Sequence, residues 1–198
     1  MCRGDLAITC LTWNIHSLNN KCDDVMGHIV DKKADIVFLT ETWQKSSHNN
    51  VTATIKRYGY TPYHKIREHG EKSRGGGVGI LCCNKYEVKA KHLNIPKPHS
   101  FEFCMYSLAV QEKSGKNCNI LLIALYRDQY VPMDIFIDEF DQLLQSVIML
   151  NAYFIISGDF NIWWGTSSDD AIHFSDLLDS YMALFSMFHN LPMLSIIH

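Results

Sequence analysis

The sequence predicts a single domain of the α/β class. Of its 198 residues, 47% are hydrophobic and 20% are charged, a balance that suits one soluble domain with a substantial core. Short apolar runs typical of strands recur between segments whose apolar residues have the spacing of an amphipathic helix. No internal repeat, low-complexity tract or linker interrupts this order, so we expect one domain over residues 1–198.

The first half of the chain begins with a strand, a helix and a second strand. Residues 6–14 form an apolar run that ends at Asn14. Residues 22–33 predict a short amphipathic helix capped by Asp23 or Asp24, with an apolar stripe formed by Val25, Met26, Ile29 and Val30. Residues 34–43 are almost continuously apolar before Thr40 and Glu41, which is typical of a strand covered on both faces.

The middle of the chain contains loops and further strands. A polar segment at residues 44–50 precedes a candidate short helix, and a charged loop with a glycine run leads into a strand that ends near residue 83. Three more strands are expected at residues 87–95, 100–111 and 119–129.

The last third alternates helix, strand and helix. The longest expected helix covers residues 134–150, and its apolar side consists of Ile135, Phe136, Phe140, Leu143, Leu144 and Val147. A strand beginning at Tyr153 follows, and residues 169–185 predict a final helix. Helices placed between strands in this way indicate a layered α/β fold.

Composition excludes several classes of protein. The net charge of −3 argues against a tight autonomous DNA-binding module, whose charge is usually positive. The seven cysteines are odd in number and contain no C-x-x-C pair, which indicates reduced thiols rather than a disulfide framework or a zinc site. No apolar run approaches the roughly 20 residues of a membrane span, and the first residues make a poor signal peptide. We therefore expect an intracellular protein, nuclear or cytoplasmic, that is neither secreted nor membrane-bound.

Polar residues end four of the expected strands. They are Asn14, Glu41, Tyr126, and Asp159 with Asn161. Side-chain alternation along the last of these strands predicts that Asp159 and Asn161 share one face and that Phe160 points to the other. A turn is the alternative, because Gly-Asp and Asn are turn formers. Each residue alone has an ordinary explanation, such as a cap or a solvated carboxylate. Their shared position at strand ends predicts a site.

Six motifs then carry a resemblance to a known family. "TWNIHSLNNK", "DIVFLTETW", "RGGGVGIL", "SFE", "ALYR" and "GDFNIWW" occur in the order found in the endonuclease/exonuclease/phosphatase superfamily. More narrowly, residues 8–181 resemble the apurinic-type endonuclease domain of non-LTR retrotransposons. The resemblance implies a four-layer α/β/β/α sandwich of two mixed β-sheets flanked by helices, with the active site at one rim.

The same resemblance implies a role for each residue at the strand ends. Glu41 matches the family's metal-binding glutamate, with Asn14 beside it as a ligand or a positioning amide, and the metal is Mg²⁺ or Mn²⁺. Asp159 matches the aspartate that orients and deprotonates the attacking water. Asn161 and Tyr126 match donors of hydrogen bonds to the pentacovalent phosphate. The expected partner is DNA, bound through its phosphates.

Two neighbouring features allow more than one interpretation. Arg127 is expected to bind a DNA phosphate, and a surface salt bridge is an equal alternative. Trp163 and Trp164 could stack on nucleic-acid bases, or they could be partly buried against the following helix.

The chain also departs from the family pattern near its end. It contains no Asp-His pair, and neither His189 nor His198 stands in the matching context. We therefore expect a domain that is incomplete at the C-terminus, with part of the second sheet missing and an exposed edge beside residues 153–157. Three functions remain open: an impaired or inactive DNA endonuclease, a catalytically dead remnant that only binds, and a phosphatase or sphingomyelinase of the same superfamily.

Overall fold

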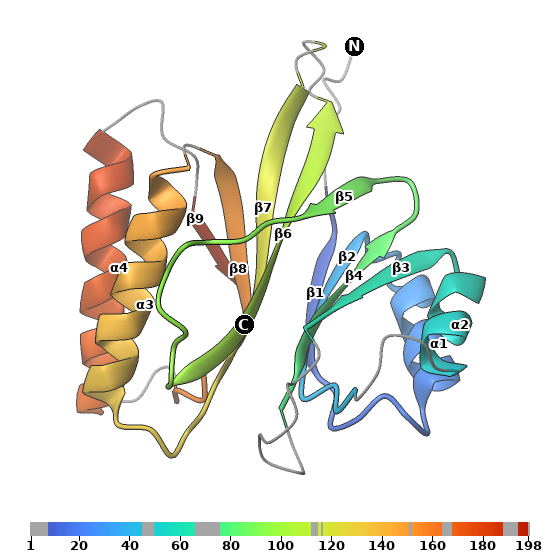
Figure 1. The fold of residues 1–198 in the computed structure, drawn as a ribbon, viewed down its shortest axis with the longest axis horizontal. Helices are drawn as coiled ribbons and strands as arrows, with labels where there is room; N and C mark the ends of the chain where they lie inside the picture. Colours follow the sequence, from blue (N-terminus) through green and yellow to red (C-terminus); the bar gives the residue numbers. More distant parts are fainter. Residues whose placement is uncertain are drawn as a thin grey trace.

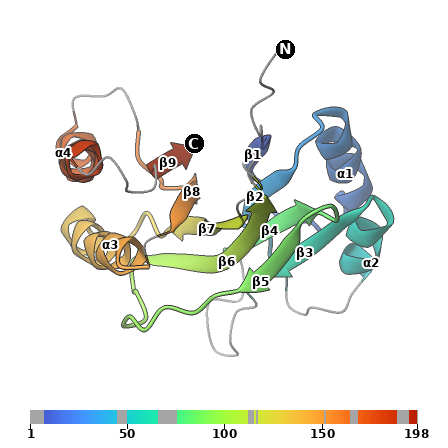
Figure 2. The same ribbon diagram turned by 90° about the horizontal axis from the view of Figure 1, so that it is seen from above.

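The computed structural model describes residues 8–44, 50–65, 76–111, 115, 117–150, 152–163, 168–187 and 194–197. Within this part of the chain, two β-sheets face each other and a pair of helices covers the outer face of each sheet (Figures 1 and 2). The layers therefore follow the order helices, sheet, sheet, helices. This confirms the predicted four-layer sandwich.

The first sheet has the strand order β1-β2-β4-β3. The strands are β1 (Cys10–Asn14), β2 (Ile36–Thr40), β3 (Tyr60–His64) and β4 (Val78–Cys83). Strands β1 and β2 are parallel, whereas β4 runs antiparallel to both of its neighbours, so the sheet is mixed. Every residue of β2 is buried, as its apolar sequence predicted, because α1 (Cys22–Asp31) and α2 (Asn50–Arg57) cover one face and the second sheet covers the other (Figure 2).

The second sheet has the order β5-β6-β7-β8-β9. The strands are β5 (Glu87–Ala90), β6 (Phe101–Gln111), β7 (Asn117–Arg127), β8 (Tyr153–Asp159) and β9 (Leu194–Ile197). Its outer face is covered by α3 (Met133–Ile148) and α4 (Asp169–Met187). None of the described helices, including the 19-residue α4, is both long and apolar enough to cross a membrane.

Three hydrophobic clusters hold the four layers together. The cluster between the sheets includes Phe38 and Ile80 from the first sheet and Leu122 from the second. A second cluster lies beneath α1 and α2. The third lies between the second sheet and its helices, where four buried phenylalanine rings contact one another: Phe136, Phe140, Phe160 and Phe174. Burial on this scale is what stabilises a layered α/β fold.

The structure corrects the prediction of an exposed edge beside residues 153–157. Strand β9 pairs in parallel with β8, in the register Phe154 with Leu194 through Ser157 with Ile197. The backbone groups on that side of β8 therefore have a neighbouring strand. Strand β8 lies inside the sheet, between β7 and β9.

Candidate active site

Two parallel strand pairs, one in each sheet, bring the predicted residues to a single rim. In the first sheet Asn14 is paired with Thr40, the last residue of β2, so Glu41 follows directly after the end of that strand. In the second sheet Tyr126 of β7 is paired with Asp159 of β8. The carboxyl ends of parallel strands point in the same direction, so each pair delivers two polar residues to the same edge. A hydrogen bond between Thr12 and Ser157 joins β1 to β8 below this edge.

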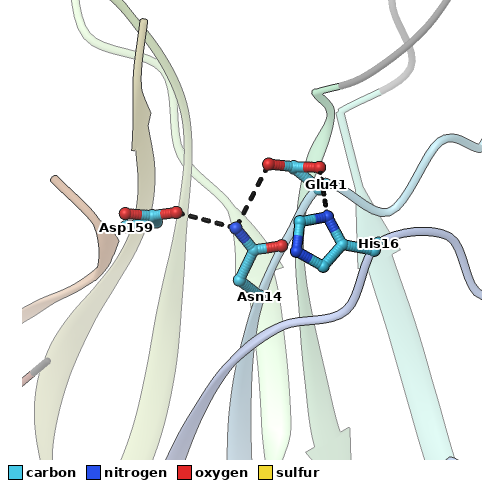
Figure 3. Close-up of polar contacts among 4 residues, drawn as sticks. All are labelled: Asn14, His16, Glu41 and Asp159. Carbon is cyan, nitrogen blue, oxygen red and sulfur yellow. Dashed lines mark hydrogen bonds and ion pairs between the residues drawn. The ribbon is translucent and has the colours of Figure 1, made fainter. Parts of the chain in front are cut away.

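Asn14 links the two sheets at the rim (Figure 3). Its side-chain nitrogen Nδ2 donates to Oε1 of Glu41 at 3.2 Å and to Oδ2 of Asp159 at 2.7 Å. The amide therefore holds two carboxylates that come from different sheets. Its oxygen Oδ1 is buried without a hydrogen-bond partner. The contacts of Nδ2 are those of a positioning amide, which is one of the two roles that the resemblance implied for Asn14. In the other role, the unpartnered Oδ1 is the atom that would bind the cation.

Glu41 is held in an uncommon backbone conformation, with φ of +52°. The segment that follows it is fixed by the backbone: Thr42 N donates to Gly77 O at 3.2 Å, and Trp43 N donates to Gly76 O at 3.1 Å. The carboxylate of Glu102 accepts a 2.9 Å hydrogen bond from Gly77 N, which anchors this turn to β6. Strained backbone is frequent at functional sites, and here it directs the Glu41 carboxylate across the rim toward Asn14.

Two further side chains contact the carboxylate of Glu41. His16 Nδ1 lies 2.7 Å from Oε2 (Figure 3), and the Tyr126 hydroxyl forms a hydrogen bond to Glu41. Burial, and then the negative charges of Glu41 and Asp159, raise the pKa of Tyr126 to about 12. Tyr126 is therefore a protonated hydrogen-bond donor at neutral pH. His16 was part of a quoted motif but was not predicted as a site residue; its position two residues after Asn14 is the only sequence signal.

Asn161 does not lie where strand alternation would place it. Strand β8 ends at Asp159, and Asn161 has φ of +50°. Its backbone N–H donates to Oδ1 of Asp159 at 3.0 Å, which is the local hydrogen bond of an Asx turn. Its side-chain nitrogen donates to the backbone oxygen of Arg127 at 2.7 Å. This segment is therefore a turn, which was the alternative interpretation of the sequence. The backbone N–H of Asn161 holds the Asp159 carboxylate in place.

The Arg127 side chain is buried, whereas the sequence predicted that it binds a DNA phosphate. Its side chain is only 4% exposed, and its Nη atoms donate to the backbone oxygens of Asn161 and Val131 at 3.0 and 3.2 Å. The guanidinium also lies 5.3 Å from the centre of the Phe136 ring. Burial lowers the pKa of Arg127. Neither a phosphate contact nor a surface salt bridge fits this environment, and Arg127 instead ties the Asp159 turn to the core.

The structure describes one of the two predicted tryptophans and neither of the two C-terminal histidines. Trp163 is 84% exposed, so it is not buried against the following helix. Trp164, His189 and His198 lie outside the described residues.

The rim offers a carboxylate, that of Glu41, which could hold a divalent cation. Within the described ranges, no group of three or more His, Cys, Asp or Glu side chains is arranged to hold a metal ion. In the same part of the chain, no Lys or Arg forms an ion pair with Glu41 or Asp159, and the basic side chain in contact with Glu41 is His16. Mg²⁺ in proteins is often held by one or two carboxylates and keeps several waters. Glu41 fits that pattern.

Comparisons with solved structures show where this fold occurs. The AP endonuclease of Archaeoglobus fulgidus aligns with a TM-score of 0.63 at 16% identity, covering 88% of this chain and 71% of that chain. The endonuclease domain of TRAS1, a telomere-specific non-LTR retrotransposon, aligns with a TM-score of 0.58 at 13% identity, covering 88% and 70%. The human Nocturnin catalytic domain has a TM-score of 0.55 at 16% identity, covering 86% and 70%. At these identities the likeness shows the fold alone.

The family assignment comes from the sequence itself. A search of curated proteins found no match. Residues 11–184 match the endonuclease/exonuclease/phosphatase family. This stretch contains all of the rim residues described above, from Asn14 to Asn161. Together with the four-layer fold, this match shows that the chain belongs to the endonuclease/exonuclease/phosphatase family.

Proposed function

We propose that this protein is a divalent-cation-dependent phosphodiesterase that nicks DNA, and that it derives from a non-LTR retrotransposon endonuclease. The observation that carries the proposal is the Asn14 amide, which joins Glu41 and Asp159 in one hydrogen-bonded unit at the rim. The retrotransposon-type motifs and the fold shared with the TRAS1 endonuclease domain support DNA as the substrate.

Hydrolysis of a phosphodiester requires a cation site, a base and donors to the phosphate. A Mg²⁺ or Mn²⁺ ion held by Glu41 would neutralise charge on the phosphate and on the leaving oxygen. Asp159 is the proposed base that takes a proton from the attacking water. Each of its oxygens already accepts one hydrogen bond, from the Asn14 side chain and from the Asn161 backbone. The two hydrogen bonds leave other lone pairs of the carboxylate free to accept a proton from water. They also hold the side chain in place before the reaction, so little conformational entropy is lost in the transition state.

Tyr126 is the proposed donor to a non-bridging phosphate oxygen. Its hydroxyl stays protonated because its pKa is raised to about 12, and it lies beside both carboxylates of the rim. Its single O–H proton points to Glu41 in the structure, and it would turn to the phosphate oxygen when the substrate binds and stabilise the negative charge of the transition state. For Asn161 we propose the same role for the amide hydrogen that is not used on Arg127 O.

We expect slow turnover from the 198-residue chain. The sequence contains no Asp-His pair, and a positioned acid–base group contributes roughly 10²- to 10⁴-fold to rate. The assay must therefore measure single-turnover cleavage, with protein in excess over DNA. An added family-type C-terminal segment that carries an Asp-His pair should raise the rate.

The experiment compares three substrates: supercoiled plasmid, a small phosphodiester and a small phosphomonoester. Wild type and Glu41→Gln are measured with Mg²⁺, Mn²⁺ or a chelator, and Asp176→Asn on the exposed face of α4 is the matched control. We expect cation-dependent plasmid nicking that falls to background in Glu41→Gln and is unchanged in Asp176→Asn. Preferential hydrolysis of the monoester would identify a phosphatase instead. DNA binding without cleavage, even with the added segment, would identify a binding remnant.

A further inference from the structure

We infer that His16 supplies an imidazole nitrogen to the cation site at Glu41 and makes the site prefer Mn²⁺ over Mg²⁺. This inference rests on the proposed function, because it assumes that Glu41 holds a divalent cation. It assigns a ligand that the sequence did not predict.

Of the side chains that contact Glu41, His16 is the one whose chemistry suits a second metal ligand. In the described part of the chain, three side chains contact this carboxylate: Asn14, His16 and Tyr126. Asn14 presents an NH₂ group and Tyr126 a protonated hydroxyl, so both act as hydrogen-bond donors. In the present contact Nδ1–H of His16 donates to the Glu41 carboxylate, which can only accept. A bound cation would take the place of that proton, and the neutral imidazole, with its proton on Nε2, would then offer the Nδ1 lone pair.

The distance between the two donor atoms suits a shared ion. His16 Nδ1 and Glu41 Oε2 are 2.7 Å apart. Two ligand atoms that lie about 2.1 Å from one ion, at right angles, are about 3 Å apart. A shift of a few tenths of an ångström would therefore let both atoms bind the same cation. The side chain of His16 is 65% exposed, so it has room to make this movement, whereas that of Glu41 is only 15% exposed.

The backbone fixes both donors at the same point of the rim. Ile15 N donates to Thr40 O at 3.0 Å, and Ser17 N donates to Glu41 O at 2.8 Å. These two bonds continue the pairing of β1 and β2 beyond the ends of the strands. His16 and Glu41 both have positive φ, of 44° and 52°. As an exposed ion pair alone, the contact would contribute little to stability.

An imidazole ligand changes the metal that a site prefers. Mg²⁺ binds oxygen ligands and keeps its waters, whereas first-row transition metals, of which Mn²⁺ is the weakest binder, also accept an imidazole nitrogen. A site of one carboxylate and one imidazole, with waters at the remaining positions, therefore favours Mn²⁺ over Mg²⁺. Such a site involves only two ionisable side chains, which is consistent with the absence of any three-residue His, Cys, Asp or Glu cluster among the described residues.

The test measures metal binding directly. Calorimetry and electron paramagnetic resonance give the Kd of Mn²⁺, and competition gives that of Mg²⁺, for wild type, His16→Asn and Glu41→Gln. Asn tolerates positive φ, so His16→Asn should keep the local backbone. His173→Asn, on the exposed side of α4, is the matched control. Circular dichroism verifies that each variant is folded.

In His16→Asn we expect a loss of Mn²⁺ affinity of about tenfold to 100-fold and a change of less than about threefold for Mg²⁺. Electron spin echo measurements should show a ¹⁴N coupling to bound Mn²⁺ in wild type and His173→Asn, and none in His16→Asn. Mn²⁺ that binds through Glu41 without a ¹⁴N coupling, and with unchanged affinity in His16→Asn, would overturn the inference and leave the proposed function standing. Failure of wild type to bind either cation would overturn both.

Discussion

The side-chain nitrogen of Asn14 lies 2.7 Å from Oδ2 of Asp159, although the two residues are 145 positions apart in the chain. One amide thus connects the carboxyl end of β1 in the first sheet to that of β8 in the second. The same nitrogen contacts Glu41, so Asn14 sets the spacing between the proposed cation site and the proposed base.

Asn14→Ala should therefore lower catalysis while leaving the fold intact. Without the bridge the two carboxylates are no longer held together, and we expect the single-turnover nicking rate to fall by about 10²-fold. The rate is measured on supercoiled plasmid, with Asn119→Ala on the exposed start of β7 as the control. A nicking rate equal to that of Asn119→Ala would show that the bridge has no catalytic role.

Gly158→Ala should displace the strand that carries Asp159. A Cβ at position 158 would lie 1.8 Å from the backbone oxygen of Leu125, and the residue has φ of +155°. Because the conflict is with backbone, β7 and β8 must separate, at a cost of about 2 kcal/mol or more.

Urea unfolding of the Gly158→Ala variant measures this cost. Gly27→Ala in α1 is the matched control, because a Cβ there meets no atom within 4 Å and alanine favours the helix. The control should gain a few tenths of a kcal/mol or more. Equal stability of the two variants would contradict the close approach of β7 and β8.

His64 should make the stability of the domain fall in mild acid. Both of its ring nitrogens are buried without a hydrogen-bond partner, and burial lowers the pKa of His64 from 6.5 to about 4. The unfolded chain then binds more protons than the folded chain between these values. The free energy of unfolding is therefore lost as pH falls from about 6.5 towards 4, by up to about 3 kcal/mol.

Urea titrations at pH 7, 5.5 and 4.5 test this prediction. His64→Phe removes the titrating group and keeps a ring of similar size, so it should lose less stability than wild type over this range. The pH dependence is the quantity compared, because the substitution itself changes packing. Identical pH profiles for the two proteins would show that His64 is not the group responsible.

Trp163 should contribute to binding of single-stranded DNA. It is 84% exposed and lies four positions after Asp159, and stacking of a base on an aromatic ring is worth about 1–3 kcal/mol. Trp163→Ala should raise the Kd about fivefold to 100-fold, as measured by fluorescence anisotropy. Met149→Ala, which removes an equally exposed side chain at the end of α3, should leave the Kd unchanged. An unchanged Kd in Trp163→Ala would exclude stacking at this position.

Regular periodicity made much of the fold predictable. The apolar run of β2 and the helical spacing of α1 and α3 follow from burial, and these elements form where they were expected. Val30 in α1 and Ile135 in α3 were wrongly placed on the buried faces, because they are 43% and 41% exposed. The residues that cap the helices were harder to predict. Helix α1 has Lys21 as its N-cap with no side-chain hydrogen bond, whereas Asp23 and Asp24 lie within the first turn, where their charges favour the helix dipole.

Features set by distant partners could not be read from local sequence. Strand β9 has only four residues and depends on pairing with β8, so its sequence carried no clear signal. The burial of Arg127 depends on carbonyl oxygens of Asn161 and Val131. The contact of His16 with Glu41 joins residues 25 positions apart. In contrast, the meeting of Asn14, Glu41, Tyr126 and Asp159 at one rim was predictable, because the carboxyl ends of parallel strands lie at the same edge of a sheet. The catalytic roles of these residues stay predictions.

The most direct test of the central claim is single-turnover plasmid nicking by wild type and by Asp159→Asn, each with Mn²⁺, with Mg²⁺ and with a chelator. Asp159→Asn keeps the size of the side chain and removes the proposed base, and Asp176→Asn on α4 controls for the loss of one negative charge. We predict slow nicking that requires a cation, is unchanged in Asp176→Asn and falls by at least about 10²-fold in Asp159→Asn. Cation-dependent nicking at the wild-type rate in Asp159→Asn would show that the rim formed by Asn14, Glu41 and Asp159 is not the active site.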